Sequence, residues 1–203
     1  MVLPRLYAIL EASGFSDTGP LLHYAEELLS AGVTLLQYRN KHGSARQMLS
    51  HARELRRVAG DRARLIMNDR ADLCLAAGFD GVHLGQDDLP PEAARRIVGK
   101  PLWMGVSTHS PEQLRRADQT DADYLAIGPV FATSSKANPD PVVGLEGVRA
   151  ARALTRKPLV AIGGITRSNA RSVIEAGADA VAVISDLLQD PRHAVEEFQR
   201  VLG

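Results

Sequence analysis

The sequence predicts an α/β fold, a single parallel (β/α)₈ barrel of the TIM type, from two observations. First, short apolar runs alternate with amphipathic stretches from one end of the chain to the other. The runs are continuously rich in Val, Ile and Leu, which is typical of parallel strands buried on both faces. Second, Ala77-Gly78-Phe79-Asp80 is echoed by Ala176-Gly177-Ala178-Asp179, close to half the chain away. That spacing favours a closed barrel over the alternative, an open doubly wound sheet.

The expected elements follow from these runs. Eight strands alternating with helices in a chain of 203 residues is a compact count for this architecture. The expected strands are Leu6–Leu10, Thr34–Tyr38, Leu65–Asn68, Gly81–Leu84, Leu102–Val106, Tyr124–Ile127, Leu159–Ile162 and Ala180–Ile184. The clearest helical patterns are Leu21–Ala31, Ala45–Ala59, Gly144–Leu154 and Asn169–Ala176.

Composition limits the class of protein. With 45% apolar and 24% charged residues and no Pro/Gly/Ser linker, residues 1–203 are expected to form one domain. The 24 basic and 24 acidic residues balance, so no nucleic-acid partner is expected. The apolar run in Met1–Leu10 is too short for a signal peptide or a membrane span. The lone Cys74 lies in an apolar stretch, which predicts a buried packing residue in a reducing, cytoplasmic location. The oligomeric state is not fixed, and a homodimer stays open.

Polar residues gather directly after the predicted strands. In a barrel these carboxyl ends lie on one face, where barrel enzymes build their active sites. The opposite face receives plain connectors such as Ala31-Gly32. The polar segments are Gln37–Lys41, Asn68–Arg70, Gly85–Asp88, Ser107–His109, Thr133–Lys136, Gly163–Thr166 and Ser185–Asp186.

The first of these segments carries alternating polar side chains. Gln37, Arg39 and Lys41 occur at every second residue, so on an extended segment they share one direction. An amide and two cations converging there suit a diphosphate, because Arg offers a planar fork and Lys a point charge. The alternative is a solvated strand end. A buried strand that leads directly into these residues favours an anionic ligand.

Two carboxylates follow neighbouring strands. Asp69 and Asp88 come after the third and fourth predicted strands, beside Asn68. Mg²⁺ commonly takes one or two protein carboxylates together with waters and substrate phosphates. The alternatives are a helix cap for Asp69 and a turn before Leu89-Pro90-Pro91 for Asp88. The pairing beside a basic cluster favours the metal.

A second anion site is predicted after the last two strands. Gly163-Gly164-Ile165-Thr166 is expected to open a helix, where glycines allow close approach and free N–H groups bind phosphate. Ser185 would complete this site, and Thr166 is interpreted as a cap.

The loops after the fifth and sixth strands add further candidates. Ser110-Pro111-Glu112-Gln113 is a capping box, which leaves Ser107 and Thr108 free to face the site. For His109 a surface or capping role is favoured over a catalytic one. Phe131–Gly144 is a long loop on which Lys136 is expected to close over a phosphate.

Taken in order, these segments resemble the thiamine-phosphate synthase (thiamine-phosphate pyrophosphorylase) family over nearly the whole chain. The family pattern Thr-x-Thr-Lys is replaced here by Thr133-Ser134-Ser135-Lys136, which keeps a hydroxyl and loses a methyl. The matching segments are Gln37–Lys41, Asn68-Asp69, Gly81–Asp88, Gly105–His109, Gly128–Lys136, Gly163–Thr166 and Val183–Ser185.

The resemblance implies a transferase that joins hydroxymethylpyrimidine diphosphate to hydroxyethylthiazole phosphate, giving thiamine phosphate and diphosphate. It implies departure of diphosphate to a pyrimidinylmethyl cation, which the thiazole nitrogen captures. By resemblance the pyrimidine diphosphate would be held by Gln37, Tyr38, Arg39, Asn40, Lys41, Asn68, Ser107 and Lys136. Among these, the catalytic residues would be Arg39, Lys41, Ser107 and Lys136. The thiazole phosphate would be held by Thr133, Ser134, Ser135, Gly164, Ile184 and Ser185, and Mg²⁺ by Asp69 and Asp88.

Three alternatives stay open. A thiazole tautomerase of the same barrel group would use a histidine near the fifth strand, and His109 keeps that open. A phosphosugar isomerase or lyase would share only the phosphate loops. A non-catalytic sensor of thiamine precursors would be expected to lose the metal carboxylates. The whole constellation of cations and carboxylates favours the synthase.

Overall fold

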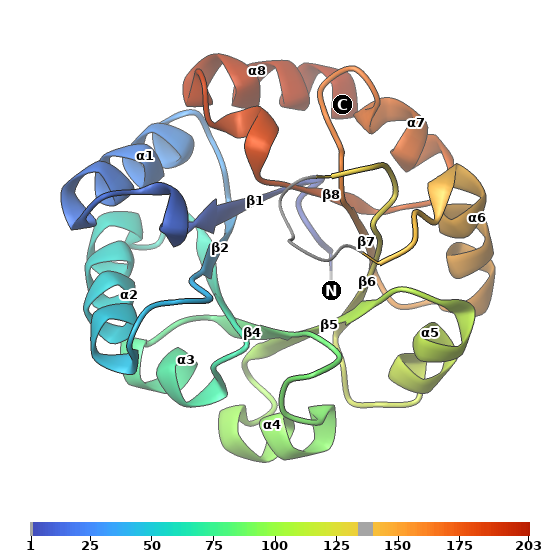
Figure 1. Ribbon diagram of the computed structural model, residues 1–203, viewed down its shortest axis with the longest axis horizontal. Helices are drawn as coiled ribbons and strands as arrows, with labels where there is room; N and C mark the ends of the chain where they lie inside the picture. Colours follow the sequence, from blue (N-terminus) through green and yellow to red (C-terminus); the bar gives the residue numbers. More distant parts are fainter. Residues whose placement is uncertain (1, 134–139) are drawn as a thin grey trace.

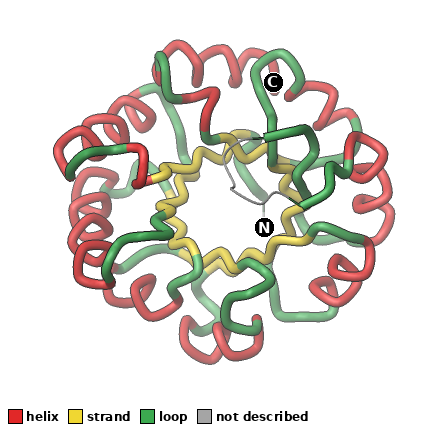
Figure 2. The backbone as a smooth tube through the Cα atoms, viewed as in Figure 1, coloured by secondary structure: helices red, strands yellow, loops and turns green. Residues whose placement is uncertain are grey.

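The computed structural model describes residues 2–133 and 140–203, and in these the strands close into a parallel barrel ringed by helices (Figures 1 and 2). Each strand pairs with the next along the chain, and the last pairs with the first, so the predicted (β/α)₈ barrel is confirmed. The strands are β1 (Leu6–Glu11), β2 (Leu35–Arg39), β3 (Arg64–Asn68), β4 (Gly81–Leu84), β5 (Trp103–Thr108), β6 (Tyr124–Ile127), β7 (Leu159–Ile162) and β8 (Ala180–Val183).

The helices follow the strands one by one and form the outer ring in Figure 2. They are α1 (Thr18–Ser30), α2 (Ala45–Ala59), α3 (Ala71–Ala77), α4 (Pro91–Val98), α5 (Pro111–Asp118), α6 (Gly144–Leu154), α7 (Ala170–Glu175) and α8 (Pro191–Leu202). Two short 3₁₀ turns, Ala12–Gly14 and Ser185–Leu187, follow β1 and β8. Helix α1 begins before the predicted Leu21, because the Asp17 carboxylate caps it by accepting the Gly19 N–H at 2.9 Å.

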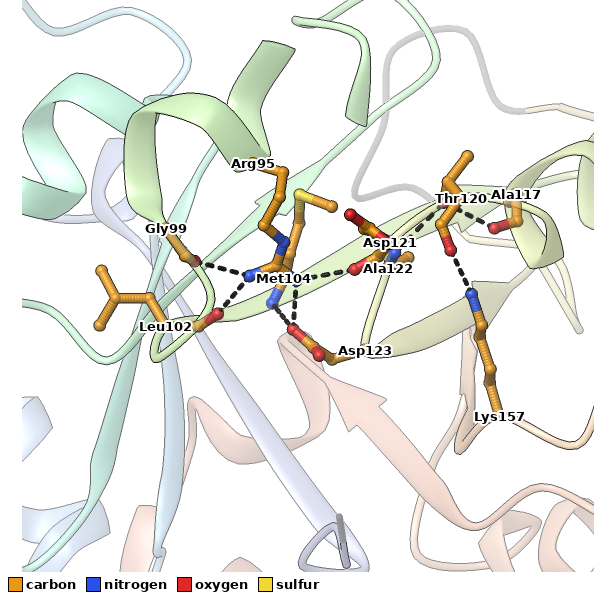
Figure 3. A network of polar contacts seen from close by, with 10 residues as sticks. All are labelled: Arg95, Gly99, Leu102, Met104, Ala117, Thr120, Asp121, Ala122, Asp123 and Lys157. Carbon is orange, nitrogen blue, oxygen red and sulfur yellow. Dashed lines mark hydrogen bonds and ion pairs between the residues drawn. The ribbon is translucent and has the colours of Figure 1, made fainter. Parts of the chain in front are cut away.

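The repeated helix-end motif has a structural cause at the amino-terminal face of the barrel. Before β6, the Asp123 carboxylate accepts the Met104 N–H of β5 at 2.8 Å and an Arg95 N–H at 2.6 Å (Figure 3). Arg95 also donates to the carbonyls of Gly99 and Leu102, so it ties α4 to the strands. The same arrangement occurs before β4, where Asp80 accepts from Arg56 and from the Leu65 N–H. It occurs again before β8, where Asp179 accepts from Arg152 and from the Leu159 N–H.

The core has two layers, as parallel strands buried on both faces require. An inner cluster fills the barrel and includes Tyr7, Ile66 and Tyr124. A larger outer cluster lies between strands and helices. Cys74 belongs to the outer cluster and is fully buried, which confirms its predicted packing role.

The thiol of Cys74 is expected to be inert in the folded protein. It lies 3.2 Å from the carbonyl oxygen of Gly81, and burial raises its pKa to about 12. Because the thiolate is the reactive form, reaction with a disulfide reagent at pH 8 should be about a thousandfold slower than in urea-denatured protein. A colorimetric thiol assay measures both rates. Comparable rates would contradict the burial of this side chain.

Candidate active site

A cavity of about 460 Å³ opens at the carboxyl ends of the strands. All eight strands contribute to it, and the segments that follow β2 to β8 form its rim. The predicted site residues that line it are Gln37, Arg39, Lys41, Asn68, Asp69, Asp88, Ser107, Thr133, Gly164, Ile184 and Ser185. Tyr38 and Asn40 do not line it, and Ser134, Ser135 and Lys136 lie outside the described residues.

The two cations of β2 and its following loop reach the cavity in ion pairs. Arg39 pairs with Glu11, which lies opposite it on β1, and Lys41 Nζ lies 2.5 Å from a carboxylate oxygen of Asp69. Sequence reasoning missed Glu11, whose position as the last residue of β1 was the available signal. Both cations of this part of the site are therefore paired with carboxylates.

Tyr38 and Asn40 support the loop and do not point into the cavity. Strand side chains alternate, so Tyr38 faces away from the barrel interior and its hydroxyl lies 3.0 Å from His51 Nδ1 on α2. The Asn40 amide oxygen accepts the N–H of Gly43 at 2.7 Å, and its amide nitrogen donates to the Tyr38 hydroxyl. The structure thus separates these two residues from the rest of the predicted diphosphate site.

The two predicted metal carboxylates are neighbours. Burial and the adjacent Asp88 carboxyl raise the pKa of Asp69 to about 6, while the hydrogen bond from Lys41 opposes this shift. Asp69 does not cap α3, whose cap residue is Arg70, so the capping alternative is wrong. Asp88 does support its turn, because it accepts the Gly85 N–H at 2.6 Å.

This carboxylate pair fits Mg²⁺ better than a metal held by protein alone. Among residues 2–133 and 140–203 no group of three or more His, Cys, Asp or Glu side chains could hold a metal. Beside the pair, the buried amide nitrogen of Asn68 has no hydrogen-bond partner among those residues. Leaving a buried donor unpaired is costly, so a ligand oxygen is the natural partner. Two carboxylates and a ligand phosphate form a donor set typical of Mg²⁺.

The glycines after β7 are held in left-handed conformations. Gly163 has φ +100° and Gly164 has φ +63°, and both pack against the segment after β6. A Cβ on Gly164 would lie 2.4 Å from the Ala132 carbonyl oxygen. The expectation that this segment opens a helix is wrong, because α7 begins only at Ala170. The backbone N–H groups here belong to a loop.

The hydrogen bonds of Thr166, Thr108 and Ser110 test three further predictions about helix caps and cavity-facing hydroxyls. Thr166 is not a cap, because its hydroxyl contacts Ser168 and its N–H is bound by Asn169. Thr108 does not face the cavity, because it is buried and its hydroxyl donates to the Ala126 carbonyl at 2.8 Å. Ser110 does cap α5, as predicted, by accepting the Gln113 N–H.

His109 lines the cavity but is tied to the loop after β6. Its Nδ1 lies 2.6 Å from the Gly128 carbonyl oxygen, and its Nε2 lies 3.5 Å from a carboxylate oxygen of Asp140. The His109 N–H donates to the Gln113 side chain. These contacts hold His109 between two loops in the cavity wall, which differs from the surface or capping role that was favoured.

Sequence reasoning missed the polar floor of the cavity. Tyr7 and His83 line it, and Tyr124 lies buried between them. Each is a single polar residue inside an apolar strand, and a lone residue of this kind is weak as a signal. Burial lowers the pKa of His83 to about 4, so its imidazole is neutral at neutral pH.

A closed parallel barrel with a polar cavity at the carboxyl ends of its strands defines the class of (β/α)₈ barrel enzymes. Within that class, the profile of the family described as thiamine monophosphate synthase matches residues 6–187. The chain belongs to this family, and the predicted transferase is thereby confirmed.

Individual relatives agree with the family. A thiamine-phosphate synthase from Koribacter versatilis is 64% identical over 203 residues, covering 98% of this chain and 96% of the relative. One from Chloroflexus aurantiacus is 46% identical, covering 89% and 83% of the two chains. The solved thiamine phosphate pyrophosphorylase from Pyrococcus furiosus superposes with a TM-score of 0.86 at 36% identity, covering 98% and 95%. No helix in the described part of the chain is long and apolar enough to cross a membrane.

Proposed function

We propose that the protein condenses hydroxymethylpyrimidine diphosphate with hydroxyethylthiazole phosphate, giving thiamine phosphate and diphosphate. The observation that carries this proposal is the grouping of Arg39, Lys41, Asn68, Asp69 and Asp88 in one cavity. A reaction that expels diphosphate needs positive charge and hydrogen-bond donors on the leaving group. It needs no covalent nucleophile.

The diphosphate would bind at the β2–β3 side of the cavity. Arg39 and Lys41 would exchange part of their ion pairing with Glu11 and Asp69 for contacts to phosphate oxygens. Asn68 would gain the acceptor that its buried amide nitrogen lacks. Asp69 and Asp88 would hold Mg²⁺, which supplies charge neutralisation to the departing diphosphate when bound.

The cavity walls suit a cationic intermediate. Ile9, Ala126, Val160 and Ala182 line the barrel interior beside the polar groups. When the carbon–oxygen bond to diphosphate breaks, these apolar walls exclude water that would otherwise capture the cation. The electron pair of the bond leaves with the diphosphate oxygen, and the thiazole nitrogen then forms the new carbon–nitrogen bond. Ser107, at the wall formed by β5, would contact the pyrimidine substrate.

The thiazole phosphate would bind at the β6–β8 side. Thr133, Gly164, Ile184 and Ser185 come together there at the cavity rim. Ser134 and Ser135 are further candidates for this phosphate from the sequence, whereas Lys136 is a candidate for the pyrimidine diphosphate. The two substrates would then meet across the barrel mouth, where alignment alone contributes much of the rate.

The test is formation of thiamine phosphate from the two purified precursors, with Mg²⁺ and then with EDTA. We expect product only with Mg²⁺. Absence of product in both cases, with thiazole phosphate still bound in calorimetry, would instead favour a tautomerase or a sensor. Product formed at an equal rate in EDTA would support the synthase activity and refute its dependence on Mg²⁺.

A further inference from the structure

A chain of hydrogen-bonded side chains crosses the barrel floor beneath the cavity. Gln37 Nε2 lies 2.8 Å from the Tyr7 hydroxyl, which lies 3.0 Å from the Tyr124 hydroxyl. The Tyr124 hydroxyl lies 3.0 Å from His83 Nδ1, and His83 Nε2 lies 2.8 Å from Ser107 Oγ. Five different strands supply these side chains. We call this chain of five side chains, Gln37, Tyr7, Tyr124, His83 and Ser107, the relay. Both of its ends, Gln37 and Ser107, line the cavity.

The relay has a direction, which follows from satisfying each buried group. The Tyr7 oxygen accepts from the Gln37 amide, so the Tyr7 proton is donated to Tyr124. Tyr124 then donates to His83 Nδ1, which leaves the proton of the neutral imidazole on Nε2, facing Ser107. Ser107 accepts this bond, and its own proton is free to point into the cavity.

The opposite direction requires both ends to change together. If the Gln37 amide turned over, its oxygen would accept from Tyr7, and every bond in the relay would reverse. Gln37 would then offer N–H to the cavity, and Ser107 would offer a lone pair. In either direction the two cavity-facing ends therefore have opposite character. The structure has the Gln37 amide nitrogen on Tyr7, which corresponds to the first direction. The Gln37 oxygen, which has no partner among the described residues, is then the acceptor offered to the cavity, and the Ser107 hydroxyl is the donor.

The barrel is built to allow this crossing. The rings of His83 and Tyr124 stack with centroids 5.6 Å apart, and Gly105 on β5 lies beside them. A Cβ at Gly105 would lie 2.1 Å from Tyr124 Cζ and 2.5 Å from His83 Nδ1. Any side chain larger than hydrogen at this position would push the relay apart.

We propose that Tyr7, Tyr124 and His83 are positioning residues, which make the site select a ring with a hydrogen-bond donor toward Gln37 and an acceptor toward Ser107. This inference rests on the proposed function, because hydroxymethylpyrimidine diphosphate is an aminopyrimidine, whose amine is a donor and whose ring nitrogens are acceptors. The relay acts through Gln37 and Ser107, because the Tyr124 hydroxyl is fully buried beneath the cavity. Breaking it frees the Gln37 amide and the Ser107 hydroxyl to take either direction.

The decisive variant is Tyr124→Phe, which keeps the ring and removes the hydroxyl at the centre of the relay. Wild type should bind the aminopyrimidine diphosphate at least tenfold more tightly than an analogue with hydrogen in place of the amine. In the variant this ratio should fall to about twofold or less, and kcat/KM for the pyrimidine substrate should fall about tenfold. The KM for thiazole phosphate should not change. Tyr7→Phe, one bond nearer to Gln37, should reproduce the loss of discrimination if Tyr124→Phe folds poorly.

Tyr24→Phe is the matched control, because the Tyr24 hydroxyl is buried in α1 without a hydrogen-bond partner among the described residues. It should leave the binding ratio unchanged. Unchanged discrimination in both Tyr124→Phe and Tyr7→Phe would overturn the relay and leave the proposed function standing. If the wild type forms no thiamine phosphate but still binds the amine-bearing ligand more tightly than its analogue, and the variants lose this preference, the proposed function is refuted and the role of the relay is supported. Wild type that binds neither ligand would refute both.

Discussion

Asp69→Asn should lower Mg²⁺-dependent formation of thiamine phosphate by about 10²–10³-fold, because it removes one of two carboxylates available to the metal. Asparagine is the sharpest substitution for this test. Asp69 has φ +63°, a conformation that asparagine tolerates better than alanine does. The amide also keeps the shape of the side chain. The loss can therefore be assigned to charge, and steady-state turnover over a range of Mg²⁺ concentrations measures it.

Two comparisons make the result specific to the metal. Asp72→Asn, in the exposed first turn of α3, removes a carboxylate paired with Arg70 and should leave turnover unchanged. Binding of thiazole phosphate by Asp69→Asn should stay nearly intact, since that ligand is assigned to the opposite side of the cavity. If Asp69→Asn turns over normally, the assignment of Mg²⁺ to this residue is wrong.

Gly164→Ala should weaken the binding of thiazole phosphate by about 10- to 100-fold, through movement of two loops together. The left-handed conformation at φ +63° costs alanine about 1 kcal/mol. The new Cβ would also meet the Ala132 carbonyl oxygen at 2.4 Å and Phe131 Cβ at 2.8 Å. Because the first of these is a backbone atom, the segment leading to Thr133 must shift. Calorimetry with thiazole phosphate measures the effect.

Gly78→Ala is the control that distinguishes the steric clash of Gly164→Ala from the backbone strain that both substitutions cause. Gly78 has φ +68° at the end of α3, and a Cβ there would meet nothing within 4 Å. Both variants should lose similar stability from the left-handed conformation, but only Gly164→Ala should lose ligand affinity. Equal affinity in the two variants would show that the contact between the β6 and β7 loops does not shape the phosphate site.

The fold could be predicted because its signals are local. Each strand is an apolar run that the chain carries whole, and each predicted strand agrees with the structure to within about two residues at its ends. The recurring Gly-x-Asp motif is visible in the sequence, but its cause is a tertiary contact, since Asp80 and Asp179 accept a backbone N–H of the preceding strand. Of the four predicted helices, α1 is the one whose start differs by more than one residue, because the Asp17 cap extends it beyond its apolar pattern.

The site could be predicted where side-chain alternation applied. Gln37, Arg39 and Lys41 share a direction along an extended segment, and all three line the cavity. Tyr38 and Asn40 were included because the family motif is continuous, although the same alternation turns them toward α2 and the loop. The period-two rule was the better guide to placement.

Contacts between distant strands were decided by the closed barrel. Tyr7, His83 and Tyr124 are isolated polar residues in three apolar runs, and no local pattern indicates that they meet. Likewise, the pairing of Glu11 with Arg39 depends on the register of β1 against β2. Local sequence determines which segments become strands, because burial and backbone preference act over a few residues. Barrel closure and register then determine which side chains face one another, because those contacts join residues that the chain itself keeps far apart.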